Sequence, residues 1–493
     1  MACRILTILS PLGLSFLAFC VSYSSGRTAA EWKSRVVYQV VTDRFAFTSK
    51  SPTSQCSVGD NYCKGTFKGI QRNLDYIAGL GVNAIWISPF TLNTNDSSGD
   101  IDYFGRWPLD IYQINPSFGT RQDLIDLVNA CHSRDIWVMA DLVIRNMGYQ
   151  DGCRINFCPS TNNFEKFTPF DKLEHYDARS TWLNNLPKLN HTNNFVRTTL
   201  INWVRDLSEE FSFDGFRLDN VDGISEEFLE ELNNSTQIFM IGQTSTSGRE
   251  LAEYQRVLDS VFDRNVYFNL NTFFGGSGGS KGYYHIPDSL SLRRDWFADG
   301  AVLGGYLDNH DVSRFIDRYS GDYTRLRNAL AYLLMAEWIP FIYYGTEQGR
   351  SFSSSSSSLW PFYVEERSLY QFISTILNHR KSLFGSAVSD YQNVAQVECS
   401  YGTTFYSFTR KTTFVIISNR GYLFSPGHLI RKHPFDKGTE LVNIFDSTDK
   451  VTVQENGTFY VTLENGGPKI YSGGTHLGQS LLLVMAICLL ILF

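Results

Sequence analysis

The chain has 493 residues, and its large aromatic fraction (15%) beside a modest charged fraction (19%) excludes disorder for most of its length. The formal net charge of −7 gives no basic field, so we expect no nucleic-acid partner. At about 150 residues per domain, the length allows roughly three domains.

The N-terminal end has the pattern of a secretory signal. Arg4 precedes an apolar run at 5–21, and the small residues Ser22 and Ser24 come next. A basic residue, an apolar stretch of this length and small residues at its end are the features of a cleaved leader. We therefore expect residues 1–24 to be a signal peptide.

Two helices are expected early in the chain that follows. The first has Ile70, Leu74 and Ile77 at helical spacing. The second opens at Thr120, and Asp123 three residues later completes the pattern of an N-terminal cap.

Short apolar strands alternate with helical patterns through the middle of the chain. Such repeats predict an α/β fold, a (β/α)₈ barrel over residues 25–384, with its chemistry just after the strands. Residues 145–195 hold no long periodic segment, so we expect a short inserted domain after the third strand. The strand candidates are 36–41, 84–87, 136–144, 215–218, 238–241, 302–307 and 340–344.

Six cysteines lie between the two ends of the chain. Cys56 and Cys63 flank a short polar loop, and Cys153 and Cys158 are a second close pair, so we expect two local disulfides. Cys131 instead lies on an apolar helical stripe, which predicts a buried free thiol. The other members of that stripe are Leu124, Leu127 and Val128.

The C-terminal part of the chain changes to a strand pattern. Alternating apolar runs at 404–408 and 413–418 predict an antiparallel β-sandwich over residues 385–471.

The last residues, 472–493, have the pattern of a GPI-attachment signal. Ser472 and two glycines precede a short polar spacer and an uncharged tail at 481–493, which is too short to span a bilayer comfortably. Small residues, spacer and apolar tail are typical of a segment replaced by a lipid, so we expect attachment at Ser472 and membrane anchoring through it. An uncleaved tail anchor is the alternative.

Five glycosylation sequons agree with a secreted glycoprotein at the plasma membrane or cell wall. Their asparagines are Asn95, Asn190, Asn233, Asn234 and Asn456.

Polar residues follow two of the predicted strands. Arg217 and Asp219 lie two apart at the end of one strand, and this spacing directs both side chains to one face. The sequence Asp-Asn-His-Asp at 308–311 ends another strand. Two such clusters in one barrel predict a site built from carboxylates.

The segments at 37–45, 84–89, 215–219 and 309–311 resemble the fungal α-amylases. The resemblance extends from about residue 30 through the barrel and, more weakly, into the C-terminal domain. It implies retaining cleavage of α-1,4-glucan by an Asp nucleophile and a Glu acid/base about 5 Å apart, assisted by a second Asp. It implies an α-glucan or oligosaccharide as the partner, and we expect a monomer.

Residue by residue, Asp219 matches the nucleophile and Asp311 the aspartate that stabilises the transition state. The substrate-binding positions that we carry over are Arg217, His310, Trp107 and Arg314.

The chain departs from the family at the acid/base. The family has Ile-Gly-Glu at the end of its fifth strand, whereas this chain has Ile-Gly-Gln with Gln243 last. A carboxamide has no titratable proton for the leaving oxygen, and such help is worth about 10²–10⁴-fold. Phe104 and Arg106 replace the His and Tyr of the family's Tyr-His-Gly-Tyr-Trp motif, so a stacking ring and a hydrogen-bonding group are lost. Asn146 and Asp222 replace a further His and a Lys.

The calcium site of the family is also altered. Two of its oxygen ligands are replaced by Arg145 and Lys188, and Ca²⁺ needs several oxygen ligands. We therefore expect no metal cofactor. Our hypothesis is that the two cations replace the charge of the ion and tie the inserted domain to the barrel.

Three functions fit the sequence. The first is a cell-surface α-amylase-family protein, hydrolase or transglycosylase, whose hydrolytic activity is weak or absent because of Gln243. The second is a non-catalytic glucan-binding protein or cell-wall component. The third is a transporter-associated or structural partner that uses the barrel only as a scaffold, which only the general independence of fold and function supports.

Overall fold

A computed structural model of the chain describes eight stretches of residues. The predicted signal peptide, most of the inserted domain and the C-terminal tail lie outside them. The described residues are 27–48, 62–93, 102–148, 188–275, 285–351, 367–385, 394–422 and 424–473.

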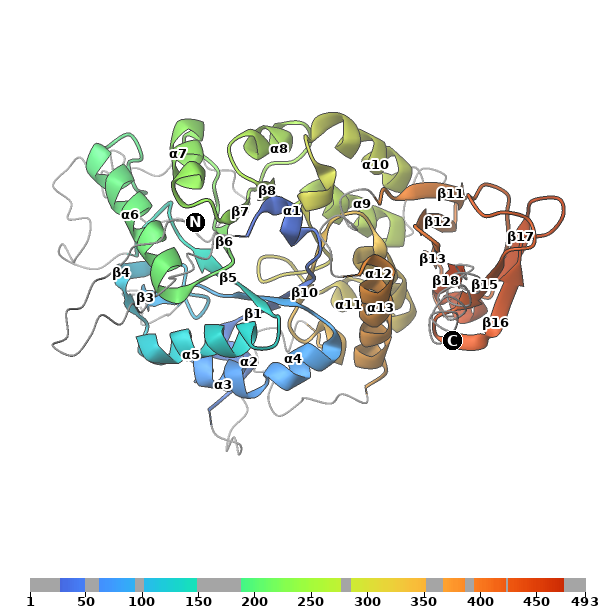
Figure 1. The fold of residues 1–493 in the computed structure, drawn as a ribbon, viewed down its shortest axis with the longest axis horizontal. Coiled ribbons are helices and arrows are strands. Elements are labelled where there is room, and N and C mark those ends of the chain that lie inside the picture. Colours follow the sequence, from blue (N-terminus) through green and yellow to red (C-terminus); the bar gives the residue numbers. More distant parts are fainter. Residues whose placement is uncertain are drawn as a thin grey trace, which may run out of the picture.

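Eight parallel strands form a barrel in the order β8-β7-β6-β5-β2-β1-β10-β9 (Figure 1). The ends of this sheet meet where Phe262 pairs with Gly304 and where the Asp263 N–H donates to the Gly304 carbonyl at 2.9 Å. The predicted barrel is therefore confirmed. The strands are β1 (Val37–Val40), β2 (Ala84–Ile87), β5 (Trp137–Leu142), β6 (Gly215–Leu218), β7 (Phe239–Gly242), β8 (Ser260–Val261), β9 (Gly304–Tyr306) and β10 (Ile339–Tyr343).

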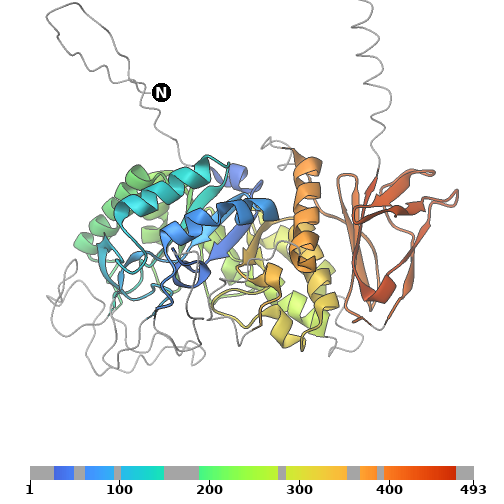
Figure 2. The same ribbon diagram turned by 90° about the horizontal axis from the view of Figure 1, so that it is seen from below.

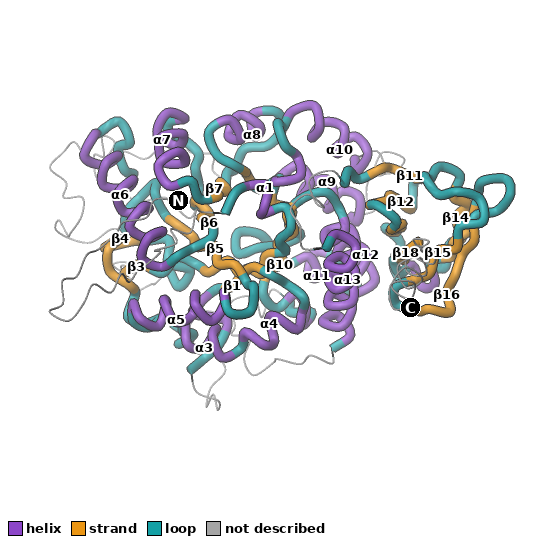
Figure 3. Tube along the Cα trace, viewed as in Figure 1, coloured by secondary structure: helices purple, strands orange, loops and turns teal. Residues whose placement is uncertain are grey.

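Helices surround these strands, and the hairpin of β3 (Thr91–Asn93) and β4 (Pro108–Ile114) extends from the barrel (Figure 3). The barrel strands are buried on both faces, which is why they are continuous apolar runs. The helices are α1 (Ala29–Trp32), α2 (Thr42–Phe45), α3 (Phe67–Arg72), α4 (Leu74–Leu80), α5 (Arg121–His132), α6 (Asn194–Phe211), α7 (Glu226–Thr236), α8 (Glu250–Glu253), α9 (Arg264–Gly275), α10 (His285–Trp296), α11 (Phe315–Arg318), α12 (Tyr323–Met335) and α13 (Ser368–Phe384).

The predicted start of α5 is confirmed. The Thr120 side chain accepts the Asp123 N–H, and the Asp123 side chain accepts the Thr120 N–H, so two free helix donors are satisfied. The first predicted helix is instead two helices, α3 and α4, that are separated at Asn73.

The C-terminal domain contains two antiparallel sheets with a shared apolar core, as the strand pattern predicts. Phe414 and Ile416 of the larger sheet belong to the same buried cluster as Phe459 and Val461 of the smaller one. The larger sheet has the order β11 (Val397–Tyr401), β12 (Phe405–Arg410), β13 (Thr413–Ser418), β18 (Lys469–Gly473), β15 (Glu440–Asn443) and β16 (Asp446–Thr452), and the smaller pairs β14 (Gly427–Ile430) with β17 (Phe459–Thr462).

The two domains are joined by buried contacts of α12. Asn328 donates to the Gly466 carbonyl at 2.8 Å and accepts the Ser418 N–H at 2.7 Å, and Arg410 donates to the Ala336 carbonyl at 2.7 Å. Figure 2 shows the helix α13, in orange, standing between the barrel and the C-terminal sheets.

Each domain contains one buried free thiol among the described residues, Cys131 on α5 and Cys399 on β11. Burial raises the pKa of both thiols, that of Cys399 to about 12. Cys63 is disulfide-bonded. Its predicted partner Cys56 and the predicted pair of Cys153 with Cys158 lie outside the described residues.

No helix in the described stretches combines the length and the apolar character that crossing a bilayer requires.

Candidate active site

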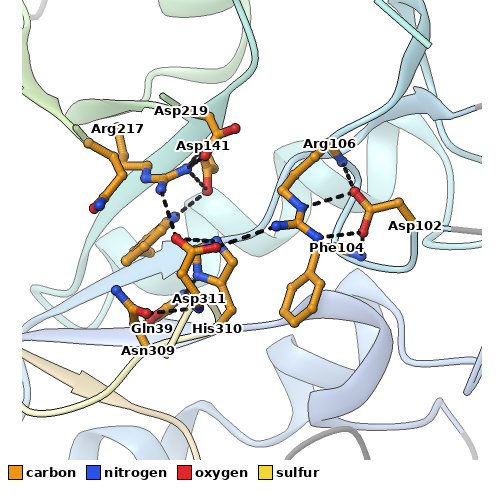
Figure 4. A network of polar contacts seen from close by, with 12 residues as sticks. Gln39, Asp102, Phe104, Arg106, Asp141, Arg217, Asp219, Asn309, His310 and Asp311 are labelled. Atoms are coloured by element: carbon orange, nitrogen blue, oxygen red, sulfur yellow. Dashed lines mark hydrogen bonds and ion pairs between the residues drawn. The ribbon is translucent and has the colours of Figure 1, made fainter. Parts of the chain in front are cut away.

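The predicted polar clusters meet at the carboxyl ends of the barrel strands (Figure 4). Asp141 belongs to β5 and Arg217 to β6, and Asp219 directly follows β6. His310 and Asp311 lie in the segment after β9. The sequence expectation that these residues share one site agrees with their positions.

Arg217 is the centre of this group. Its side chain is fully buried, and Nη1 donates to Asp141 at 2.9 Å and to Asp219 at 2.5 Å, while Nη2 lies 3.9 Å from Asp311. Burial opposes the charged form, but the carboxylates of Asp141 and Asp219 outweigh it and raise the pKa of Arg217. Trp86 donates its indole N–H to Asp141 at 3.1 Å. A permanent cation therefore holds the predicted nucleophile.

His310 is fixed by a residue that the sequence did not single out. Gln39 of β1 donates its amide to Nδ1 of His310 at 2.8 Å, so the ring proton is on Nε2, which lies 3.5 Å from Asp311. Burial lowers the pKa of His310 to about 4, although Asp311 opposes this shift. The imidazole is therefore neutral at neutral pH. The signal for Gln39 was a polar residue inside a buried apolar strand.

A turn at residues 102–106 contributes a second guanidinium. Arg106 contacts Asp102 through Nε at 3.1 Å and Nη2 at 3.3 Å, and its Nη1 lies 3.4 Å from Asp311. The ring of Phe104 lies 5.1 Å from the His310 ring between centroids. Both predicted sugar contacts, His310 and Asp311, are thus in contact with this turn (Figure 4).

Gln243 occupies the predicted acid/base position. Leu218 pairs with Gly242, and the Gln243 N–H donates to the Leu218 carbonyl at 3.0 Å, so Gln243 follows β7 next to the point where Asp219 follows β6. Its Nε2 donates to the Thr244 carbonyl at 3.3 Å, and its Oε1 is buried with no hydrogen bond from any described residue. The residue that follows β7 at this position therefore carries a carboxamide in place of a carboxyl group.

Asp222 organises the loop that follows Gln243. Its carboxylate accepts the Ser245 N–H at 2.6 Å and the hydroxyls of Thr244 and Thr246. Sequence reasoning recorded Asp222 only as a departure from the family. Glu250, the other nearby carboxyl group, is exposed at the start of α8.

Two further predicted sugar contacts are Trp107 and Arg314. Trp107 is half-buried just before β4. Arg314 is 2% exposed, donates to the Tyr344 carbonyl at 2.7 Å and lies over the Tyr343 ring, so it supports the end of β10. Asn146, which takes the place of a family histidine, donates to the Arg106 carbonyl at 3.2 Å.

The residues at the predicted calcium positions do not fit a calcium ion. The Leu189 N–H donates to the Arg145 carbonyl at 2.8 Å, and Asn146 and Lys188 form an isolated antiparallel β-bridge. The two cationic residues, Arg145 and Lys188, therefore lie on backbone segments that pair with each other. The described stretches contain no group of three or more His, Cys, Asp or Glu side chains that could hold a metal. The rest of the inserted domain, which our hypothesis for these cations involves, lies outside the described residues.

Comparisons with known proteins bear on the family and the fold of the chain. A family model for the α-amylase catalytic domain matches residues 39–374. The α-amylase 2 of Schwanniomyces occidentalis is 29% identical over 502 residues, which cover 92% of each chain. An uncharacterized glycosyl hydrolase of Schizosaccharomyces pombe is 30% identical over 79% of this chain and 82% of its own. The solved α-amylase of Malbranchea cinnamomea has a TM-score of 0.79 at 25% identity, covering 90% of this chain and 97% of that one.

Proposed function

Because the chain belongs to the α-amylase catalytic-domain family, we propose that it is a glucan-binding member of that family with weak or no hydrolytic activity. The observation that carries the proposal is Gln243 at the end of β7, beside Asp219. In a retaining glycosidase one carboxylate attacks the sugar while a carboxylic acid protonates the leaving oxygen. A carboxamide cannot supply that proton, so the leaving group departs as an unstable anion.

No other carboxyl group among the described residues is placed to act as the acid. Asp222 is engaged by the backbone and hydroxyls of the loop after β7, and Glu250 points into solvent. Burial raises the pKa of Asp141 to about 7 against the effect of Arg217, but both of its oxygens accept a hydrogen bond from Arg217 or Trp86. A missing general acid costs about 10²–10⁴-fold in rate.

The ligand class that we propose is an α-glucan or maltooligosaccharide. Solved structures with this fold include complexes with maltotriose and with maltose. The retained Asp219 and the half-buried Trp107 support this ligand class, because a carboxylate accepts from sugar hydroxyls and an indole ring can pack on a sugar face. A non-catalytic wall component that uses the same contacts is the second form of this proposal.

We also propose that the protein is a glycoprotein anchored at the cell surface. Two of the sequons are in turns where the asparagine accepts from its own threonine hydroxyl, Asn190 from Thr192 at 2.7 Å and Asn456 from Thr458 at 2.9 Å. Asn233 and Asn234 belong to the last turn of α7, and Asn95 lies outside the described residues.

The C-terminal pairing bears on where the lipid is attached. Ser472 belongs to β18, and the following Gly473 pairs with Leu441 of β15. Attachment at Ser472 would remove Gly473 from the sheet, so attachment C-terminal to Gly473 is favoured over Ser472. Mass spectrometry of the C-terminal peptide, after enzymatic release of the lipid, identifies the attached residue.

One set of assays tests the proposed function. We expect the wild-type protein to bind maltooligosaccharides by calorimetry while it releases almost no reducing sugar from soluble starch. Asp219→Asn is the control for turnover. Robust wild-type hydrolysis that Asp219→Asn abolishes would refute the proposal.

A further inference from the structure

We propose that Arg106 and Phe104 occupy the sugar-contacting groups of Asp311 and His310, so that a glucan binds this site only outside the cleavage position. The inference rests on the proposed glucan binding and defines which part of the site the glucan reaches. Arg106 and Phe104 are then specificity-determining residues that exclude one sugar unit.

Arg106 forms an ion pair with Asp311. Oδ1 of Asp311 lies 3.4 Å from Arg106, and Oδ2 lies 3.5 Å from His310 and 3.9 Å from Arg217. Both carboxylate oxygens therefore lie near donors of the protein itself, although 34% of the Asp311 side chain stays exposed at the mouth of the site. Burial would raise the pKa of Asp311, but His310, Arg106 and Arg217 together lower it, so the carboxylate stays charged.

Two aromatic side chains, Phe104 and Trp86, pack against the ring of His310. Phe104 lies against the ring at 5.1 Å between centroids, and Trp86 approaches it at 5.7 Å in an edge-on arrangement. Gln39 occupies Nδ1, and the proton on Nε2 points toward Asp311. Each polar atom of the imidazole thus has a neighbour before any sugar arrives.

The turn at residues 102–106, which carries Phe104 and Arg106, is held in place by hydrogen bonds to Asp102. Asp102 is buried and accepts the N–H groups of Phe104 at 3.2 Å and Arg106 at 2.8 Å, besides the guanidinium. Gly105 has φ of +91°, and a Cβ there would lie 2.4 Å from the Pro89 carbonyl oxygen, so the turn is pressed against the segment after β2. Asn146 also donates to the Arg106 carbonyl of this turn at 3.2 Å.

These contacts decide the competition with a sugar. A sugar hydroxyl would also donate to the charged Asp311 carboxylate, but Arg106 is a full cation that Asp102 already holds in position. Burial opposes the charge of Arg106, but Asp102 and Asp311 outweigh it and raise the pKa of Arg106. A neutral sugar must therefore displace a charged and pre-positioned donor before it reaches Asp311. Trp107, which follows Arg106 in the chain, is half-buried and is the position that the family resemblance assigns to sugar contact.

A double-mutant cycle on Arg106 and Asp311 tests the inference. We would measure maltotriose and maltoheptaose binding by calorimetry for the full chain, for Arg106→Ala, for Asp311→Asn and for the double variant. Arg106→Ala should lower the Kd at least tenfold because it exposes Asp311 to the sugar. Asp311→Asn should weaken binding at least fivefold more in the Arg106→Ala background than in the wild type, a coupling that the cycle isolates.

Two further variants keep the test independent of folding. Phe104→His with Arg106→Tyr fills the turn with the side chains of the family motif and should give the same gain. Arg134→Ala removes a surface ion pair with Asp75 and is the matched arginine control, for which Kd should stay within twofold of the wild type. Thermal melting of each variant shows that it is folded.

The results separate the two proposals. Unchanged Kd values in folded Arg106→Ala and in the motif variant, with the wild type still binding glucan, overturn the inference and leave the proposed function standing. Equal losses from Asp311→Asn in both backgrounds do the same. No glucan binding by any folded variant overturns both.

Discussion

Two neighbouring parts of the barrel mouth differ in what their side chains do for the fold. At the end of β6, the buried guanidinium of Arg217 is bound to Asp141 and Asp219. At the end of β7, the Gln243 side chain makes one hydrogen bond within the described residues, to the next residue's carbonyl. The first group cannot lose a member without leaving a buried charge unpaired, whereas the second position tolerates a neutral side chain.

This difference explains how a catalytic position can change while its neighbours remain. Arg217 and the carboxylates around it stabilise the interior of the barrel mouth whether or not they act on a sugar, because buried charges require partners. An acid/base residue faces the ligand space and stabilises little of the fold. A retained nucleophile is therefore weak evidence for catalysis when it is part of such a network.

The strongest test of this contrast restores a carboxyl group at position 243. We expect Gln243→Glu alone to raise kcat/KM on soluble starch by less than tenfold, because Arg106 still holds Asp311. Adding Phe104→His and Arg106→Tyr should raise it by about 10²–10⁴-fold, the usual value of general acid help. Reducing-sugar release is the measurement, and adding Asp219→Asn should abolish the gain. A full gain from Gln243→Glu alone would show that the turn is no obstacle.

In the Arg217 network, we expect Arg217→Ala to lower the free energy of unfolding by about 3–5 kcal/mol, because it leaves Asp141 and Asp219 buried without their cation. Urea denaturation followed by circular dichroism measures the change. Arg134→Ala, which breaks an exposed pair, should stay within about 0.5 kcal/mol. Similar effects of the two substitutions would contradict a structural role for the Arg217 network.

The buried, neutral His310 makes the stability of the fold depend on pH. The folded pKa of His310, about 4, lies below the unfolded value of about 6.5. Between these values the unfolded state binds more protons, so the contribution of His310 to stability is present above pH 6.5 and is lost as the pH falls toward 4. Unfolding curves from pH 4 to 7 should show a smaller slope for His310→Gln than for the wild type. Identical slopes, or a ring that titrates near 6.5 by NMR, would contradict the buried neutral imidazole.

The smallest effect is expected at the loop that carries Gln243. Asp222→Ala removes the acceptor of the Ser245 N–H and of the Thr244 and Thr246 hydroxyls and should cost about 1–3 kcal/mol, at a net value of about 1 kcal/mol per hydrogen bond. Faster hydrogen exchange at Ser245, with unchanged exchange in the β6 strand, is the expected result. Unchanged exchange at Ser245 would mean that the loop is held by other contacts.

The sequence predicted most of the barrel because its strands are local apolar runs. The bounds of Ala84–Ile87 and Gly215–Leu218 are correct to the residue, since both faces of these strands are buried. Strand β8 was missed because Ser260–Val261 is two residues long, too short for any pattern. The break between α3 and α4 at Asn73 was also missed, because the apolar spacing continues across it.

The site was predictable only as far as its motifs reach. Asp219 and Arg217 are two residues apart, so their shared face follows from strand geometry. Arg106 and Asp311 are separated by 205 positions, and only the closed barrel brings them to 3.4 Å. The sequence showed that two family side chains were replaced at 104 and 106, but it gave no sign that the replacements contact the sugar-binding groups.

The buried thiols give the molecule an internal reporter of unfolding. Cys131 is in the barrel and Cys399 in the C-terminal sheet, and burial raises the pKa of each, so neither forms a reactive thiolate while its domain is folded. A thiol-specific reagent added during denaturation would modify each cysteine only when the surrounding domain opens. Peptide mapping of the two labels would then show whether the contacts around Asn328 make the domains unfold together or in turn.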